Sequence, residues 1–122
     1  NLDMKWFRPH LAYTLSKYSM TLMARAWAEE FKKDGIASNT LWPATTIATA
    51  AIKNLPGGEE LIHRSRKPAI MADAAFYLLQ LDSKKNSGHS YLDEEVLKDA
   101  GVTDLGSYAI SQGGPLQADL FL

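Results

Sequence analysis

The sequence contains no cysteine among its 122 residues, which excludes a disulfide scaffold, a thiolate zinc site and a cysteine nucleophile. It also lacks an excess of either charge, because 13 Lys and Arg stand against 14 Asp and Glu. Without a basic surplus to neutralise phosphates, nucleic acid is not expected as the main partner. No apolar run approaches the roughly 20 residues that a membrane span needs, and no signal peptide is recognisable. We expect a cytoplasmic protein, or a peroxisomal or mitochondrial one in a eukaryote.

The composition that remains is that of an ordinary folded protein. Hydrophobic residues make up 46% of the chain and charged residues 22%, which is typical of globular domains and not of disordered segments. No internal repeat is visible. A chain of this length forms one small domain or part of a larger one.

The longest periodic pattern predicts a helix from Leu11 to Asp34, ended by Gly35, with Pro9 before it or in its first turn. Apolar residues recur along it at steps of three or four, in a first line of Leu11, Leu15, Tyr18, Leu22 and Ala26. A second line lies beside it and consists of Met20, Met23, Trp27 and Phe31. One sheet face would bury one line. The second is expected to pack on another copy of the chain, giving a homo-oligomer through helix 11–34, or on an absent N-terminal half.

The rest of the sequence predicts alternating helices and strands. The expected strands are Ile36–Leu41 and His89–Leu92, and the expected helices are Thr46–Asn54, Glu59–Arg64, Pro68–Leu81 and Glu94–Ala100. This order is typical of a parallel α/β layer. Two strands are too few for such a sheet. The predicted fold class is therefore α/β, as the C-terminal half of a Rossmann-like doubly wound parallel sheet, and 1–122 is expected to be a partial domain.

Tyr13 and Lys17 are the residues most suited to chemistry. They stand four positions apart on the predicted helix, so their side chains share one face, one turn apart. A free phenol has a pKa of about 10, and a neighbouring ammonium lowers it by favouring the phenolate. Such a phenol could give a proton to a carbonyl oxygen, or take one from an alcohol, while a hydride moves at the carbon. Alone, the Tyr-x-x-x-Lys spacing is weak evidence, since an amphipathic helix with a solvated lysine gives the same pattern.

The surrounding order of motifs is far more specific. The Tyr13-Thr14-Leu15-Ser16-Lys17 segment leads into Asn39, Pro43 and then the stretch Lys67–Ala75, and the whole order resembles the short-chain dehydrogenase/reductase family. Segments 41–49, 93–97, 101–104 and 115–121 are similar to one branch of that family. The resemblance implies an oxidoreductase that uses NADP or NAD to interconvert a small-molecule alcohol and a carbonyl compound, lipophilic substrates included.

The resemblance also implies roles for individual residues. Tyr13 corresponds to the catalytic acid/base, and Lys17 to the residue that lowers its pKa and holds the nicotinamide ribose. The loop after the first strand is expected to touch the nicotinamide end of the cofactor, through Pro43, Ala44, Thr45, Thr46, Ile47 and Thr49. This placement agrees with the rule that ligands bind beyond the C-terminal ends of parallel strands.

Three departures from the family pattern stand out. Ala44 follows Pro43 where the family usually has glycine, and its Cβ restricts the loop. Asp93-Glu94-Glu95 replaces the frequent Asp-Gly-Gly after the last strand. No Gly-x-x-x-Gly-x-Gly phosphate loop is present. That loop and the family's catalytic serine are expected upstream of Asn1, so the fragment alone is expected to be inactive.

Other candidates keep two interpretations. His10 and Trp42 are candidates for lining the substrate pocket. A lone histidine near a helix start is more often a surface or capping group, and core packing is an equal alternative for Trp42. Arg64, Arg66 and Lys67 form a basic cluster, interpreted as a solvated surface or as a cofactor-phosphate contact. His63 and His89 lack ligand spacing, so no metal is predicted. For the whole chain, the alternative to an enzyme is a catalytically inert interaction or lipid-handling module on the same fold.

Overall fold

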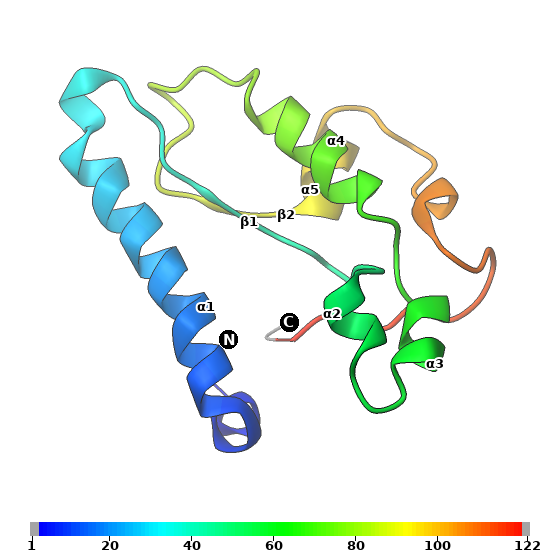
Figure 1. Ribbon diagram of the computed structural model, residues 1–122. Helices are drawn as coiled ribbons and strands as arrows, with labels where there is room; N and C mark the ends of the chain where they lie inside the picture. The colour runs from blue at the N-terminus through cyan, green and yellow to red at the C-terminus, as the bar shows by residue number, and fades with distance from the viewer. Residues whose placement is uncertain (1–2, 121–122) are drawn as a thin grey trace. The chain divides into compact units, whose positions relative to one another are not determined.

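The computed structural model describes residues 3–120 and divides into two compact units (Figure 1). The first unit comprises Asn1–Trp42, Gln80–Tyr91 and Leu120–Leu122, and the second comprises Pro43–Leu79 and Leu92–Asp119. None of the helices in the described part of the chain is long and apolar enough to cross a membrane.

Helix α1, Met4–Glu30, dominates the first unit and begins earlier than the sequence predicts. Asp3 caps its N-terminus by accepting a hydrogen bond from Lys5 N over 2.9 Å. Pro9 lies inside α1, not in a first turn, and His10 departs from helical geometry with φ −137° and ψ 39°. The cause is Pro9, which has no N–H to continue the helical ladder and kinks the helix. The expected helix from Leu11 is thus the part of α1 beyond this kink.

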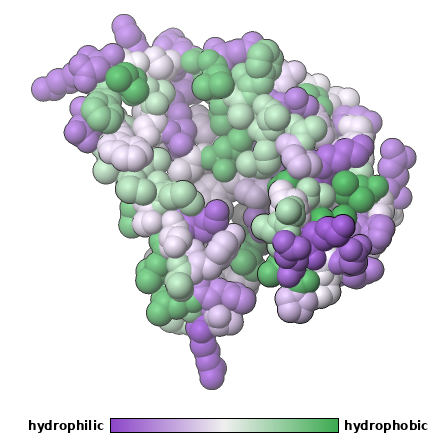
Figure 2. Space-filling model, in the orientation of Figure 1, coloured by the Kyte–Doolittle hydropathy of each residue, from purple (hydrophilic) through white to green (hydrophobic). Residues whose placement is uncertain are grey.

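The inward face of α1 is the main correction to the sequence analysis. The buried residues of α1 are Thr14, Ala24 and Ala28, which belong to neither predicted apolar line. Members of both lines are exposed instead, including Leu22 at 67% and Trp27 at 47%, and hydrophobic side chains lie at the surface along α1 (Figure 2). Small side chains allow the backbone to approach closely: a Cβ on Gly88 would lie 3.4 Å from the Ala28 Cβ. Helix α1 is followed by a 3₁₀ turn, Lys32–Asp34, and this turn ends at Gly35, whose φ of 71° suits glycine.

The sheet consists of two adjacent parallel strands, β1 (Thr40–Trp42) and β2 (Ser90–Leu92) (Figure 1). Both are shorter than predicted, because the residues before each strand pair outside regular strand geometry. Thr40 N donates to His89 O over 3.0 Å, and Gly88 N donates to Ser38 O over 2.9 Å. The mixed helix and strand order with a small parallel sheet confirms the predicted Rossmann-like α/β class.

The second unit holds four α-helices, α2 (Ala50–Lys53), α3 (Gly58–His63), α4 (Ala69–Leu78) and α5 (Asp93–Asp99), and a 3₁₀ turn, Gly106–Tyr108. Helix α4 packs against α5, and their fully buried residues include Ile70, Ala74 and Leu97. The predicted helix 46–54 is mostly wrong, because only Ala50–Lys53 is helical and Thr49 caps it through Ile52 N. Gly58 opens α3 where a Cβ would meet Lys53 O at 2.3 Å, so glycine is required there.

Candidate functional site

Tyr13 and Lys17 lie on the same side of α1, as their spacing predicts. The Lys17 ammonium is 5.5 Å from the centroid of the Tyr13 ring. Tyr13 is 49% exposed, whereas Thr14 beside it is fully buried and donates through Oγ1 to Trp6 O over 3.0 Å. The buried threonine fixes the rotation of α1 here and ties the helix together across the kink. As a result, a phenol and an ammonium are presented together at the surface of the first unit.

The two predicted substrate residues have different surroundings. His10 is exposed at the kink of α1. Trp42 ends β1 and is partly buried, with its ring centroid 6.2 Å from that of Tyr18, whose ring is in turn 5.8 Å from Phe7. The aromatic chain Phe7–Tyr18–Trp42 agrees with the core alternative for Trp42, and substrate contact stays a prediction for both residues.

The predicted cofactor loop Pro43–Thr49 belongs to the second unit and runs in extended form beside Arg66. Arg66 N donates to Thr46 O over 3.0 Å, and Ala48 N donates to Arg66 O over 2.8 Å. The Thr46 and Ser65 hydroxyls are 2.8 Å apart, and Ser65 Oγ donates to Leu61 O. This edge of the loop is therefore fixed by backbone pairing and a buried serine.

Asp93 is a residue of this region whose contact with the loop the sequence analysis missed. Its side chain is fully buried, and Oδ1 accepts hydrogen bonds from Ala44 N and Glu94 N, both over 2.8 Å. Burial raises the pKa of the Asp93 carboxyl, although these two N–H donors and the charge of Arg66 act in the opposite direction. The only signal in the sequence is the retained aspartate at the start of the altered Asp93-Glu94-Glu95 segment.

The basic cluster was interpreted as a solvated surface by default, and for Arg66 this interpretation is wrong. The Arg66 side chain is 7% exposed and forms an ion pair with Glu94, which also accepts from Lys98 Nζ over 3.0 Å. Burial opposes ionisation of Glu94, but the hydrogen bonds and charges of Arg66 and Lys98 prevail and lower its pKa. Lys67 is exposed and donates to Ser107 O over 2.9 Å.

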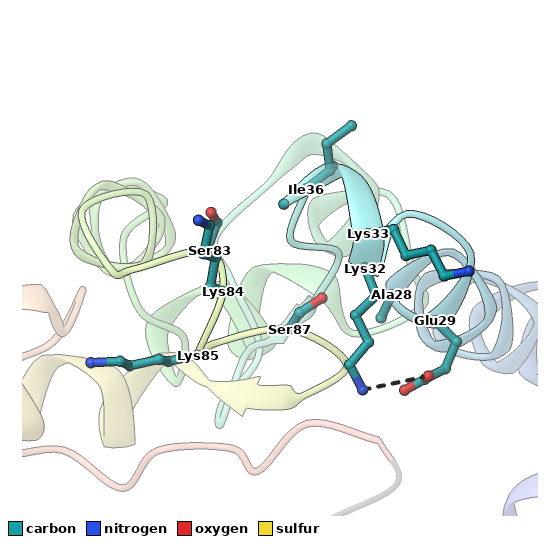
Figure 3. Close-up of a pocket in the computed structure, with 10 residues that line it drawn as sticks. Ala28, Glu29, Lys32, Lys33, Ile36, Ser83, Lys84, Lys85 and Ser87 are labelled. Atoms are coloured by element: carbon teal, nitrogen blue, oxygen red, sulfur yellow. Dashed lines mark ion pairs between the residues drawn. The ribbon is translucent and has the colours of Figure 1, made fainter.

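A separate hollow of about 400 Å³ lies in the first unit, near the end of α1 (Figure 3). Four lysines and a glutamate supply the charged groups of its lining, which are Glu29, Lys32, Lys33, Lys84 and Lys85. The lysine ammonium groups do not converge. Lys33 and Lys85 point in opposite directions, and Lys32 turns to Glu29, 3.8 Å away (Figure 3). Among residues 3–120, no group of three histidines or acids is arranged to hold a metal.

Comparison with known proteins identifies relatives over the whole chain. Hydroxysteroid dehydrogenase-like protein 2 from Xenopus laevis is 48% identical over all 122 residues, and the human protein of that name is 45% identical. A crystal structure of a short-chain dehydrogenase homologue from Mycobacterium thermoresistibile matches the whole chain with 50% identity and a TM-score of 0.86. The predicted resemblance to the short-chain dehydrogenases is confirmed.

The chain covers only part of the length of the proteins it matches. A protein from Xanthomonas campestris, provisionally assigned as a dehydrogenase, matches with a TM-score of 0.91 and 43% identity. The chain spans 44% of that structure and 28% of the Xenopus laevis and human proteins. No protein-family model matches the chain. The chain is thus similar in sequence and fold to part of these dehydrogenase-named proteins.

Proposed function

We propose that the complete protein is an NAD(P)-dependent oxidoreductase of the short-chain dehydrogenase/reductase type, acting on an alcohol or carbonyl substrate. The observation that carries this proposal is the pairing of Tyr13 with Lys17 on one exposed side of α1. When bound, the nicotinamide supplies or accepts the hydride. In the oxidative direction the Tyr13 oxygen takes the proton of the substrate hydroxyl as the hydride leaves the carbon, and in reduction it returns that proton to the carbonyl oxygen.

The donor set of the chain fits a nicotinamide nucleotide. The Lys17 ammonium has three N–H donors, which suit ribose hydroxyls, and its charge favours the phenolate of a neighbouring tyrosine. In the loop, Thr49 is exposed, and its Oγ1 accepts from Ile52 N, which leaves the hydroxyl proton available to a ligand. Thr46 N and Ala48 N are already used within the second unit. Ile47 and Thr49 are therefore the proposed cofactor contacts within the loop Pro43–Thr49.

Replacement of Tyr13 by Phe in the complete protein tests the proposal. We expect turnover to fall by about 10²–10⁴-fold, the usual contribution of a positioned acid/base. Nicotinamide absorbance follows turnover. Lys17→Met should also reduce turnover and raise the KM for the cofactor. Tyr18→Phe is the matched control. It removes the same hydroxyl from the same helix, but from a ring that packs between Phe7 and Trp42. Undiminished turnover of Tyr13→Phe would refute the assignment and favour the inert-module alternative.

We further propose that the exposed apolar residues of α1 pair with a second copy in a homo-oligomer. The proposal is supported by the exposure of Leu11, Leu15 and Leu22 at 55%, 54% and 67%. Light scattering on the complete protein should report a dimer or tetramer. Leu22→Glu should shift the complete protein toward monomer. If the parent is already monomeric, the homo-oligomer is refuted, and the exposed apolar residues of α1 pack instead on another part of the same complete protein.

A further inference from the structure

The second edge of the loop Pro43–Thr49 pairs with a segment near the end of the chain. Thr46 N donates to Gln117 O over 3.0 Å, and Asp119 N donates to Ala44 O over 3.2 Å. These bonds flank an antiparallel bridge between Thr45 and Ala118. With Arg66 on its other edge, the loop thus has the middle position in three extended segments, all of them within the second unit.

Ala44 is held from both sides of its backbone. Its N–H donates to the fully buried Asp93 Oδ1, and its carbonyl accepts from Asp119 N. Asp93 Oδ1 also accepts from Glu94 N, so one carboxylate oxygen joins the start of the loop to the start of α5. Burying a carboxyl group costs free energy, and hydrogen bonds to that group offset the cost. The buried position of Asp93 is therefore explained by its hydrogen bonds to Ala44 N and Glu94 N.

We propose that Asp93 and the segment 115–119 set the path of the loop Pro43–Thr49 and so position it for the nicotinamide end of the cofactor, an inference that rests on the proposed function. Asp93 is here a positioning residue, since it acts through Ala44. Fixing the loop before ligand arrives removes an ordering cost from binding. We call these hydrogen bonds from Asp93 and the segment 115–119 to the loop the clamp. The clamp fixes the conformation of the loop in a chain that has Ala44 in place of the glycine of the usual Pro-Gly.

The experiment compares paired variants of the complete protein. Asp93→Ala removes the acceptor for Ala44 N, while Asp93→Asn keeps a side-chain oxygen in that place and serves as its control. Asp119→Pro removes the N–H that binds Ala44 O, and Asp119→Ala retains this N–H while losing the same carboxylate. Amide hydrogen exchange at residues 44–48 reports the clamp directly, without any assay of turnover. Steady-state kinetics then give the KM for the cofactor and kcat separately.

We expect Asp93→Ala and Asp119→Pro to accelerate exchange at residues 44–48 by about tenfold, the effect of losing one net hydrogen bond. Exchange in α4 should stay as in the parent. The KM for the cofactor should rise by a similar factor and more than kcat falls, while Asp93→Asn and Asp119→Ala remain close to the parent. Equal exchange in the members of each pair would overturn the clamp. Faster exchange with an unchanged KM for the cofactor would overturn the positioning role. A parent without nicotinamide-dependent turnover would refute the proposed function, and the exchange data would still decide on the clamp.

Discussion

The side chain of Asn39 connects the segment before β1 to His89, the residue before β2. Its Oδ1 accepts from His89 N over 2.9 Å, and its Nδ2 donates to Asn86 O over 2.8 Å. One planar amide thus substitutes for ladder hydrogen bonds where the two segments are not yet regular strands. The asparagine four residues before Pro43, noticed in the sequence only as part of a family pattern, has a structural task in the first unit.

Asn39→Ala is therefore expected to destabilise the protein by about 1–2 kcal/mol, because a backbone donor and a backbone acceptor lose their partner together. Urea unfolding of the complete protein measures the change. Asn54→Ala is the matched control, since the Asn54 side chain is exposed and makes no hydrogen bond within residues 3–120. Equal unfolding midpoints for the two variants would show that the Asn39 bridge contributes nothing to stability.

Glu94 gives the fold an acid-sensitive contact. Because Arg66 and Lys98 lower its pKa in the folded state, its contribution to stability is present above the unfolded pKa of about 4.3 and is lost as the pH falls through the lower folded pKa. Glu94→Gln should cost about 1–3 kcal/mol at neutral pH. The difference from the parent should shrink on acidification below about pH 4. Unfolding curves over a pH series measure this.

The control for Glu94 is its neighbour. Glu95→Gln changes the same charge at an exposed position of α5 and should follow the parent at every pH. The ionisation of Asp93 changes stability with pH in the opposite direction to that of Glu94. The pKa of Asp93 is raised in the folded state, so its contribution to stability is lost as the pH rises. It is unchanged in both variants. A constant difference between Glu94→Gln and the parent through the acid range would contradict the assignment.

Tyr108 gives a prediction at the alkaline end. Its hydroxyl donates to Asp73 Oδ2 over 2.6 Å, and this bond, with a smaller effect of burial, raises the pKa of Tyr108 to about 12. The ultraviolet difference between the parent and Tyr108→Phe follows this one phenol. In the Asp73→Asn background the same difference should titrate nearer to about 10, the ordinary value. An unchanged titration would show that Asp73 does not control this group.

Helices with a single apolar face were predictable from the sequence. In α4 the period predicts that Ile70, Ala74, Tyr77, Leu78 and Leu81 face inward. Ile70 and Ala74 are fully buried and Tyr77 and Leu78 partly so, but Leu81 lies beyond the end of α4 and is 46% exposed. The face of α1 was not predictable in this way, because large apolar residues follow two lines of the helix while Thr14, Ala24 and Ala28 face the rest of the unit. Hydrophobic periodicity finds the largest side chains, whereas close packing of a helix on a neighbouring backbone selects the smallest.

Part of the candidate site was likewise predictable from the sequence, and part was not. The shared side of Tyr13 and Lys17 follows from helical spacing alone, so the sequence predicts it. The Asp93 contact joins residues 49 positions apart, and the buried pair of Arg66 with Glu94 joins residues 28 positions apart. No local pattern encodes such partners. The Asp93 contact meets the need of a loop backbone N–H for an acceptor, and the Arg66–Glu94 contact pairs two opposite charges, but in both cases only the fold brings the partners together.

The close approach of Ala28 to Gly88 couples two distant positions of the sequence. A Cβ at 88 would lie 3.4 Å from that of Ala28, and Gly88 also has a φ of 82°, which L-residues rarely adopt. At position 88 the obstacle to a larger residue is this positive φ, and at position 28 it is the turn at Gly88, which lies in contact with the Ala28 Cβ. In a protein-engineering library, position 88 should therefore return glycine whatever residue stands at 28, whereas position 28 should return only small residues.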